Sequence, residues 1–220
     1  MTAALTFDAL KAKQRAIRDG FPTDLGLRVH RAVSWLQRAE MAGDDSDAAF
    51  IFFWIAFNAA YADDRADAAS TGERNSFDGF FEKVIALDGG QRIYDAIWEK
   101  FSGPIRLLLE NQYVFQPFWS HHNQVPGYDD WAERFARSKR RSQSALRDRD
   151  TKVILSTLFD RMYVLRNQLV HGGSTWNSSV NRAQVRDSAR IMAFLVPLFI
   201  DLMMDHPDIP WGAPYYPVVD

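Results

Sequence analysis

The sequence predicts an all-α protein, a bundle of helices with additional helices and an irregular C-terminal tail. Almost every long stretch repeats its apolar residues at steps of three and four, which is the period of a helix. No stretch alternates apolar and polar residues between hairpin turns, so no strands are expected. Apolar residues make up 47% of the 220-residue chain and charged residues 25%. This is the composition of an ordinary globular protein, and one domain over residues 1–220 is the simplest organisation.

The N-terminal part of the chain predicts two helices. The first runs from Phe7 to about Arg18 and stops before a Gly and a Pro. The second carries apolar residues at helical spacing to about Met41, and Thr23 or Asp24 is expected to cap it.

A third helix is expected from Ala48 to Tyr61, in the centre of the bundle. The acidic run 44–47 precedes it and favours the positive end of a helix dipole. The helix is apolar nearly all round, as packing on several sides requires. Asn58 is the strongly polar side chain in its middle, and two interpretations are open. It is either a hydrogen-bonded buried amide that fixes the helix register or a group that touches a functional cleft.

The middle of the chain, 63–150, is interpreted as an elaborated helical region between two sets of core helices, at about 24–62 and 151–205. Its first part, 63–76, has the composition of a loop. The tail, 206–220, is too rich in Pro to form a regular helix, and its aromatic residues suggest that it lies against the body of the protein or a partner. Helices are expected at 77–87, 91–101, 105–122 after a break at Gly103-Pro104, 128–149, 151–171 and, finally, up to about 205.

Composition excludes several classes of function. The chain holds 26 Lys and Arg against 28 Asp and Glu, so any contact with nucleic acid must come from a local basic patch. The absence of Cys excludes disulfides, thiolate nucleophiles and Cys-ligated zinc. The most apolar stretches fall short of the roughly 20 residues that a membrane span needs, and residues 1–20 lack the pattern of a secretion signal. We expect a cytoplasmic protein without membrane contact.

The segment from Thr151 to His171 predicts a helix with an unusual wheel. Its apolar residues fill one continuous arc, and Arg166 falls inside that arc. A guanidinium there must meet carboxylates, a phosphate or a subunit interface, because burying it unpaired is costly. His171 is displaced from Arg166 by about 140° on an ideal helix, so one straight helix does not point both at one ligand. Either Gly172-Gly173 loosens the last turn and lets the imidazole swing inward, or a two-fold dimer presents both residues of both chains to one cleft.

The same segment resembles a known motif. Arg166-Asn167-Gln168-Leu169-Val170-His171, followed by Gly-Gly near the end of a helix, resembles the Arg-polar-x-x-x-His motif of the HEPN superfamily. The aromatic segment from Phe50 to Tyr61 looks like the upstream helix of HEPN proteins in bacterial defence systems. The resemblance covers about a third of the chain and implies a HEPN-type bundle that forms a homodimer.

Many members of this superfamily cut RNA without a metal, so the resemblance implies an endoribonuclease without a cofactor, of the toxin or phage-defence kind. By position, His171 would be the general acid/base, Arg166 would hold the phosphate, and Asn167 would orient the pair. Asn58 would support these three residues and touch the cleft without contacting the reacting atoms. The partners implied are RNA, a second copy and a cognate antitoxin or regulatory protein. Toxins of a related subgroup carry a nucleotidylated Tyr two residues after the His, where this chain has Gly173.

Two alternatives to the ribonuclease hypothesis are open. Some superfamily members are non-catalytic modules that bind a nucleotide or a partner protein, and a plain dimeric scaffold is a further possibility. In either case Arg166 would form a core salt bridge and His171 would complement the helix dipole.

Further basic and imidazole groups lie in the middle region. The residues Arg137, Lys139, Arg140 and Arg141 form a basic stripe that could follow an RNA backbone, although a solvated helix face is the simpler explanation. His121 and His122 are adjacent, project in different directions on a helix and are joined by no carboxylate pattern. We expect them to have a structural or interface role.

Overall fold

The computed structural model describes residues 5–62 and 73–218. Within these ranges the chain is built of helices and contains no strand, so the all-α prediction is confirmed. The helices group into two compact units, which we call unit 1 (Met1–Arg92 and Val185–Asp220) and unit 2 (Ile93–Gln184). The expected core range 24–62 lies in unit 1, whereas 151–205 is divided between the two units. No described helix combines the length and apolar character that crossing a bilayer requires.

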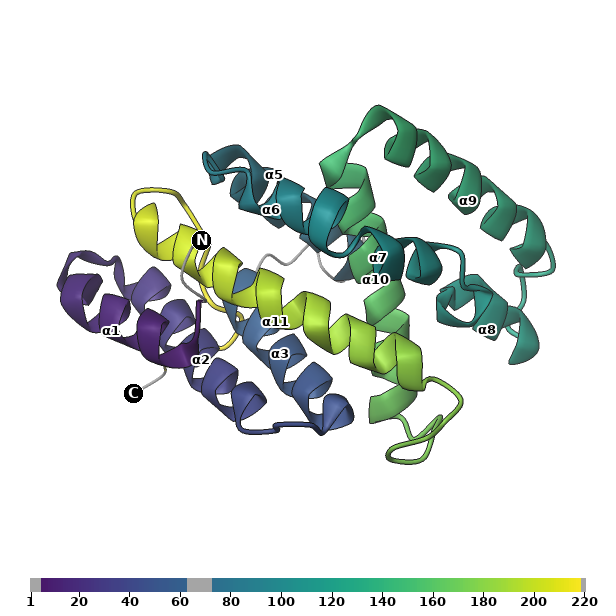
Figure 1. The fold of residues 1–220 in the computed structure, drawn as a ribbon, viewed down its shortest axis with the longest axis horizontal. Helices are drawn as coiled ribbons and strands as arrows, with labels where there is room; N and C mark the ends of the chain where they lie inside the picture. Colours follow the sequence, from purple (N-terminus) through teal and green to yellow (C-terminus); the bar gives the residue numbers. More distant parts are fainter. Residues whose placement is uncertain (1–4, 63–72, 219–220) are drawn as a thin grey trace. The chain divides into compact units, whose positions relative to one another are not determined.

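Unit 1 contains several long helices (Figure 1). Helices α2 (Thr23–Glu40) and α3 (Ser46–Tyr61) form an antiparallel pair and lie side by side. The side chain of Asp45 accepts a hydrogen bond from the Ala48 N–H (3.0 Å) and caps α3, as the acidic run predicted. Helix α2 follows Pro22 without a side-chain cap, so the expected cap at Thr23 or Asp24 was wrong. The helices are α1 (Phe7–Ile17), η1 (Arg18–Gly20), α2 (Thr23–Glu40), α3 (Ser46–Tyr61), α5 (Glu73–Leu87) and α11 (Arg182–Asp205), the last of which begins in unit 2.

Aromatic rings form the core of unit 1. The ring of Phe57, on α3, is fully buried. Its centroid lies 4.4 Å from that of Tyr61 and 6.2 Å from that of Phe199. Rings of α5 pack on the same side, among them Phe77 and Phe81. Each such side chain contributes about 1.5–3 kcal/mol by burial alone. The aromatic residues of α3 are therefore accounted for by the packing of this helix on several sides.

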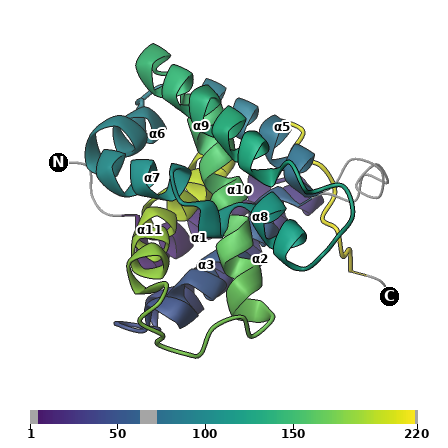
Figure 2. The ribbon, with the colours of Figure 1, turned by 90° about the vertical axis from the view of Figure 1, so that its right-hand side faces the viewer.

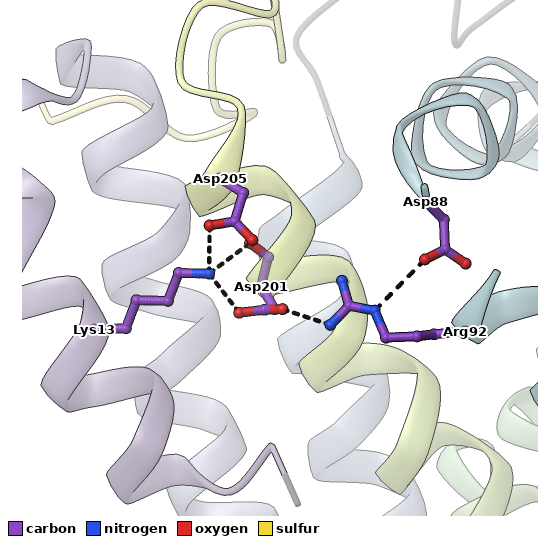
Figure 3. A network of polar contacts seen from close by, with 5 residues as sticks. All are labelled: Lys13, Asp88, Arg92, Asp201 and Asp205. Carbon is purple, nitrogen blue, oxygen red and sulfur yellow. Dashed lines mark hydrogen bonds and ion pairs between the residues drawn. The ribbon is translucent and has the colours of Figure 1, made fainter. Parts of the chain in front are cut away.

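One charged network crosses the apolar stretch of α11 (Figure 3). The carboxylate of Asp201 is 8% exposed and lies between two cations, Lys13 at 2.6 Å and Arg92 at 2.8 Å. Each cation has a second carboxylate, Asp205 for Lys13 (2.6 Å) and Asp88 for Arg92 (3.5 Å). The network ties α1 and the segment after α5 to α11, and it satisfies the charge that interrupts the apolar stretch.

The C-terminal tail packs against unit 1, and it is irregular as predicted. The guanidinium of Arg28 is fully buried and donates to the carbonyls of Ala60 (3.0 Å), Gly212 (2.9 Å) and Ala213 (2.7 Å). Trp211 is 7% exposed and packs against a Phe of α5. One buried arginine thus caps the last turn of α3 and holds the tail through its backbone.

Unit 2 contains shorter helices and one helical hairpin (Figure 2). Gly103-Pro104 falls in the first turn of α7, where Pro is well tolerated, so the expected break is the start of a helix. The side chain of Asp150 caps α10 by accepting from the Val153 N–H (3.0 Å), as expected. Helices α9 and α10 are consecutive and pack against each other. The elements are α6 (Arg92–Asp95), η2 (Ala96–Lys100), α7 (Ser102–Leu109), η3 (Gln112–Val114), α8 (Gln116–His122), α9 (Trp131–Asp148) and α10 (Thr151–Val170).

Candidate functional site

The end of helix α10 is a closed turn. The N–H of Gly173 donates to the carbonyl of Gln168 (2.7 Å), and the N–H of Gly172 donates to the carbonyl of Leu169 (3.2 Å). Gly172 has φ +69°, and these two bonds are those of a Schellman motif. A Cβ on Gly173 would lie 3.0 Å from the Gln168 oxygen. The Gly pair therefore tightens the helix end, and the loosened last turn that would swing His171 inward is not formed.

His171 is the C-cap residue of α10, and its side chain is exposed. Its backbone N–H donates to the carbonyl of Asn167 (3.0 Å), which fixes the position of its Cα atom. The imidazole makes no hydrogen bond to residues of the described ranges. The backbone is thus held while the ring stays available to a ligand.

Arg166 is held by its neighbours on α10. Its Nη1 donates to the Asn167 Oδ1 (3.0 Å), and its guanidinium carbon lies 4.9 Å from the ring centroid of Tyr163. The residue is half-buried, so the apolar arc covers it only in part. Asn167 contacts the arginine as the motif implied. The hydrogen bond and the cation–π contact limit the rotamers of the guanidinium before any ligand arrives.

The deeply buried guanidinium of α10 belongs to Arg161, which sequence reasoning missed. It is 3% exposed, donates to the Ser138 Oγ of α9 (2.8 Å) and lies 4.6 Å from the ring centroid of Phe115. A signal was present, because Arg161 stands three residues after Leu158 and four before Leu165, within the same arc. Arg161 joins α9 to the motif helix.

Gln168 links the end of α10 to two other segments of unit 2. Its Nε2 donates to the carbonyl of Tyr113 in η3 (2.6 Å), and its Oε1 accepts from the Nδ2 of Asn181 (3.1 Å). The second bond reaches the segment that precedes α11. Gln168, in the middle of the motif, therefore has a structural role that the sequence pattern did not indicate.

Large apolar side chains are exposed directly around the motif. Val170 is 55% exposed, Trp176 74% and Val180 80%. They occupy the last residue of α10 and the segment that follows it. Exposed apolar side chains are common on surfaces that associate with another molecule. The end of α10 and the segment after it thus present an exposed imidazole and exposed apolar side chains.

The basic stripe lies in the same unit as the motif but not beside its His. Arg137, Arg140 and Arg141 are exposed on α9, and Lys139 is half-buried. Ser138 of α9 contacts Arg161 of α10. The motif lies beyond this contact towards the C-terminal end of α10, and the last residues of the stripe lie beyond it towards the C-terminal end of α9. Because the chain reverses direction between the two helices, these two segments extend away from each other. Unit 2 carries 13 Lys and Arg against 9 Asp and Glu, and unit 1 carries 13 against 19. Unit 2, which holds the motif, therefore has a net positive charge, and unit 1 has a net negative charge.

Asn58 belongs to unit 1, on α3, whereas the motif belongs to unit 2. Its Oδ1 is buried and accepts no hydrogen bond from the part of the chain that the structure describes. The structure thus groups Arg166, Asn167 and His171 on one helix end of unit 2, and Asn58 belongs to the other unit.

The adjacent histidines of α8 have local partners. The Nδ1 of His122 lies 2.8 Å from the carbonyl of Phe118, and its ring stacks on the Phe118 ring at 4.0 Å between centroids. The Nδ1 of His121 lies 3.5 Å from a carboxylate oxygen of Asp129. Across 5–62 and 73–218, no three His, Asp or Glu side chains gather as a metal site would require. These contacts are structural.

No protein-family model, no curated protein and no solved structure matches this chain, so the candidate site stands on its own residues and their geometry.

Proposed function

We propose that this chain is a metal-independent endoribonuclease of the HEPN type, acting as a cytoplasmic homodimer in a toxin or phage-defence setting. The observation that carries the proposal is the end of α10. There, an exposed His171 with a fixed backbone follows an Arg166 that Asn167 already orients. Metal-free cleavage of a phosphodiester needs an imidazole as acid/base and a guanidinium that stabilises the phosphate charge.

The proposed reaction is an attack within the RNA. The imidazole of His171 removes the proton of a ribose 2′-hydroxyl, whose oxygen attacks the adjacent phosphorus. The bond to the 5′-oxygen breaks, and that oxygen takes a proton from a water molecule, so the products are a 2′,3′-cyclic phosphate and a 5′-hydroxyl. Arg166 binds the phosphate oxygens and stabilises the charge that builds on them.

A homodimer would bring Arg166 and His171 to the same phosphate. The closed end of α10 keeps His171 about 140° away from Arg166 around an ideal helix, so one chain alone does not enclose a phosphate with both groups. A two-fold axis beside Val170 and Trp176 would bury exposed apolar surface and bring two copies of the motif together. The positive charge of unit 2 would attract the RNA.

The first experiment compares cleavage of total RNA and of tRNA in EDTA by wild type, His171→Ala and Arg166→Ala. Loss of general acid/base catalysis should lower the rate by about 10²–10⁴-fold. The matched controls are His30→Ala and Arg15→Ala, which change exposed residues of unit 1 and should cleave like wild type. Equal cleavage by all five proteins, or no cleavage under any condition, would refute the proposal. Stabilisation by a nucleotide without cleavage would favour a non-catalytic binding module.

A second experiment tests the shared site. Arg166→Ala and His171→Ala are mixed, unfolded together and refolded, so that about half of the dimers contain one chain of each kind. If each site takes Arg166 from one chain and His171 from the other, every mixed dimer regains one complete site. The mixture should then recover about a quarter of the wild-type rate, since half of the dimers hold one intact site of two. No recovery would mean that both groups of a site come from the same chain.

A further inference from the structure

Unit 1 contains a cavity of about 470 Å³ that the proposed ribonuclease reaction does not use. It lies where α2 ends and α3 begins, against the first half of α11. Sites for small molecules commonly have volumes of about 300–1,000 Å³. The cavity is therefore of a size for a small metabolite.

The floor of this cavity is apolar and shallow. Ala39, Ala49 and Ala189 line it and are 2%, 7% and 6% exposed, together with Phe53 at 5%. The small side chains come from three helices, and Phe53 adds an aromatic ring to the apolar lining. Such a floor suits the apolar side chain of a ligand.

The rim of the cavity carries charges of both signs from different elements. Glu40 ends α2 and Asp44 follows it in the turn before α3, whereas Arg186 and Arg190 stand one turn apart on α11. Neither Asp44 nor Arg190 forms an ion pair or a side-chain hydrogen bond with a described residue. The acidic and basic sides are thus close enough to line one cavity yet do not neutralise each other.

One carboxylate oxygen of Glu40 already accepts a hydrogen bond within the protein. Its Oε1 accepts a hydrogen bond from the N–H of Phe7 (2.7 Å), which leaves its other oxygen available. Burial raises the pKa of Glu40, although the hydrogen bond from Phe7 acts in the opposite direction. A cation placed beside this carboxylate would favour its ionised form.

We propose that this cavity binds a free α-amino acid with an apolar side chain. The carboxylate of the ligand would lie between Arg186 and Arg190, its ammonium group beside Asp44 and Glu40, and its side chain on the floor around Phe53. Two positive and two negative groups line the rim, so a zwitterion meets a partner at each end. A phosphate ester, which carries only negative charge, would leave both carboxylates facing an anion.

The test measures binding by calorimetry at neutral pH with L-phenylalanine and L-leucine. N-acetyl-L-phenylalanine lacks the ammonium charge and L-phenylalaninamide lacks the carboxylate, and each should bind at least about tenfold more weakly, since each loses a charge-assisted hydrogen bond. Inorganic phosphate and adenosine monophosphate serve as the anionic comparison. If these anions bind and the amino acids do not, the ligand class is wrong. The absence of binding by any amino acid at millimolar concentration would overturn the proposal outright.

Matched variants locate the binding site. Arg190→Gln and Asp44→Asn each remove one charge from an exposed side chain and should each weaken amino-acid binding by at least about tenfold. Arg15→Gln and Asp208→Asn make the same chemical changes at exposed positions outside the cavity and should bind like wild type. Unchanged circular dichroism and melting temperature establish that each variant folds. Binding that Arg190→Gln and Asp44→Asn leave intact would place the amino acid elsewhere. This inference does not depend on the ribonuclease proposal.

Discussion

Replacing Asp201 by Asn should destabilise unit 1 far more than the same change at its neighbour Asp205. Removing one partner of a fully buried ion pair costs about 3–5 kcal/mol, because it leaves a charge uncompensated. Asp201 is 8% exposed, but Lys13 and Arg92 are 28% and 27% exposed, so water recovers part of this cost. Each cation also keeps its second carboxylate (Figure 3). We therefore expect a loss of about 2 kcal/mol, which is about 4–8 °C in melting temperature for a chain of this size.

The matched control for this prediction is Asp205→Asn. Asp205 is 48% exposed, and among the described residues Lys13 is its one ion-pair partner, so its removal should cost no more than about 1 kcal/mol. Thermal and urea unfolding, followed by circular dichroism, measure both variants against wild type. Equal losses for the two variants would show that burial of Asp201 does not set the strength of the network. A loss below about 0.5 kcal/mol for Asp201→Asn would show that the network is only a surface ion pair.

Three further predictions concern other parts of the structure. Gly172→Ala should cost about 1 kcal/mol in urea unfolding, because Ala resists the positive φ that closes α10; an unchanged midpoint would argue against this turn. The hydrogen bond from Arg134 holds the pKa of Asp130 below its usual value. The pair therefore stabilises the fold fully at a pH above the usual pKa of Asp, and this stabilisation is lost as the pH falls through the lowered pKa. NMR titration should show this lowered pKa in wild type and a return towards the usual value in Arg134→Gln; the same pKa in both would contradict the assignment. Arg28→Lys, which cannot reach three carbonyls with one planar group, should speed proteolysis of the tail, and unchanged proteolysis would show that other contacts hold it.

Local chemistry made several helix ends predictable. The caps at Asp45 and Asp150 were found because a carboxylate bonds to an N–H only three residues ahead, so the whole signal is short in sequence. Helix α5 begins at Glu73, four residues before the predicted start. The sequence of its first turn, 73–76, is polar, and such a sequence has the same composition as a loop. The predicted loop residues 63–72 lie outside the described residues.

The candidate residues could be picked out from the sequence, but the way they pack could not. The wheel placed Arg166 in the apolar arc, but it could not show that Arg161 would be the guanidinium buried against α9. Both positions satisfy the helical period, and only the path of the neighbouring helix decides which one it covers. The same limit applies to Gln168, since its partner Tyr113 is 55 residues away in sequence.

The glycines after His171 make oligomeric state the decisive property of this protein. The sequence left two ways to bring Arg166 and His171 to one phosphate, a flexible helix end and a two-fold dimer. Because Gly172 and Gly173 close the helix in a Schellman motif, the imidazole cannot move inward without breaking two backbone hydrogen bonds, at about 0.5–1.5 kcal/mol each. A cleft shared by two chains needs no such change. If the protein is monomeric at every concentration and in the presence of RNA, the ribonuclease proposal therefore loses the geometry on which it depends, whatever the motif resembles.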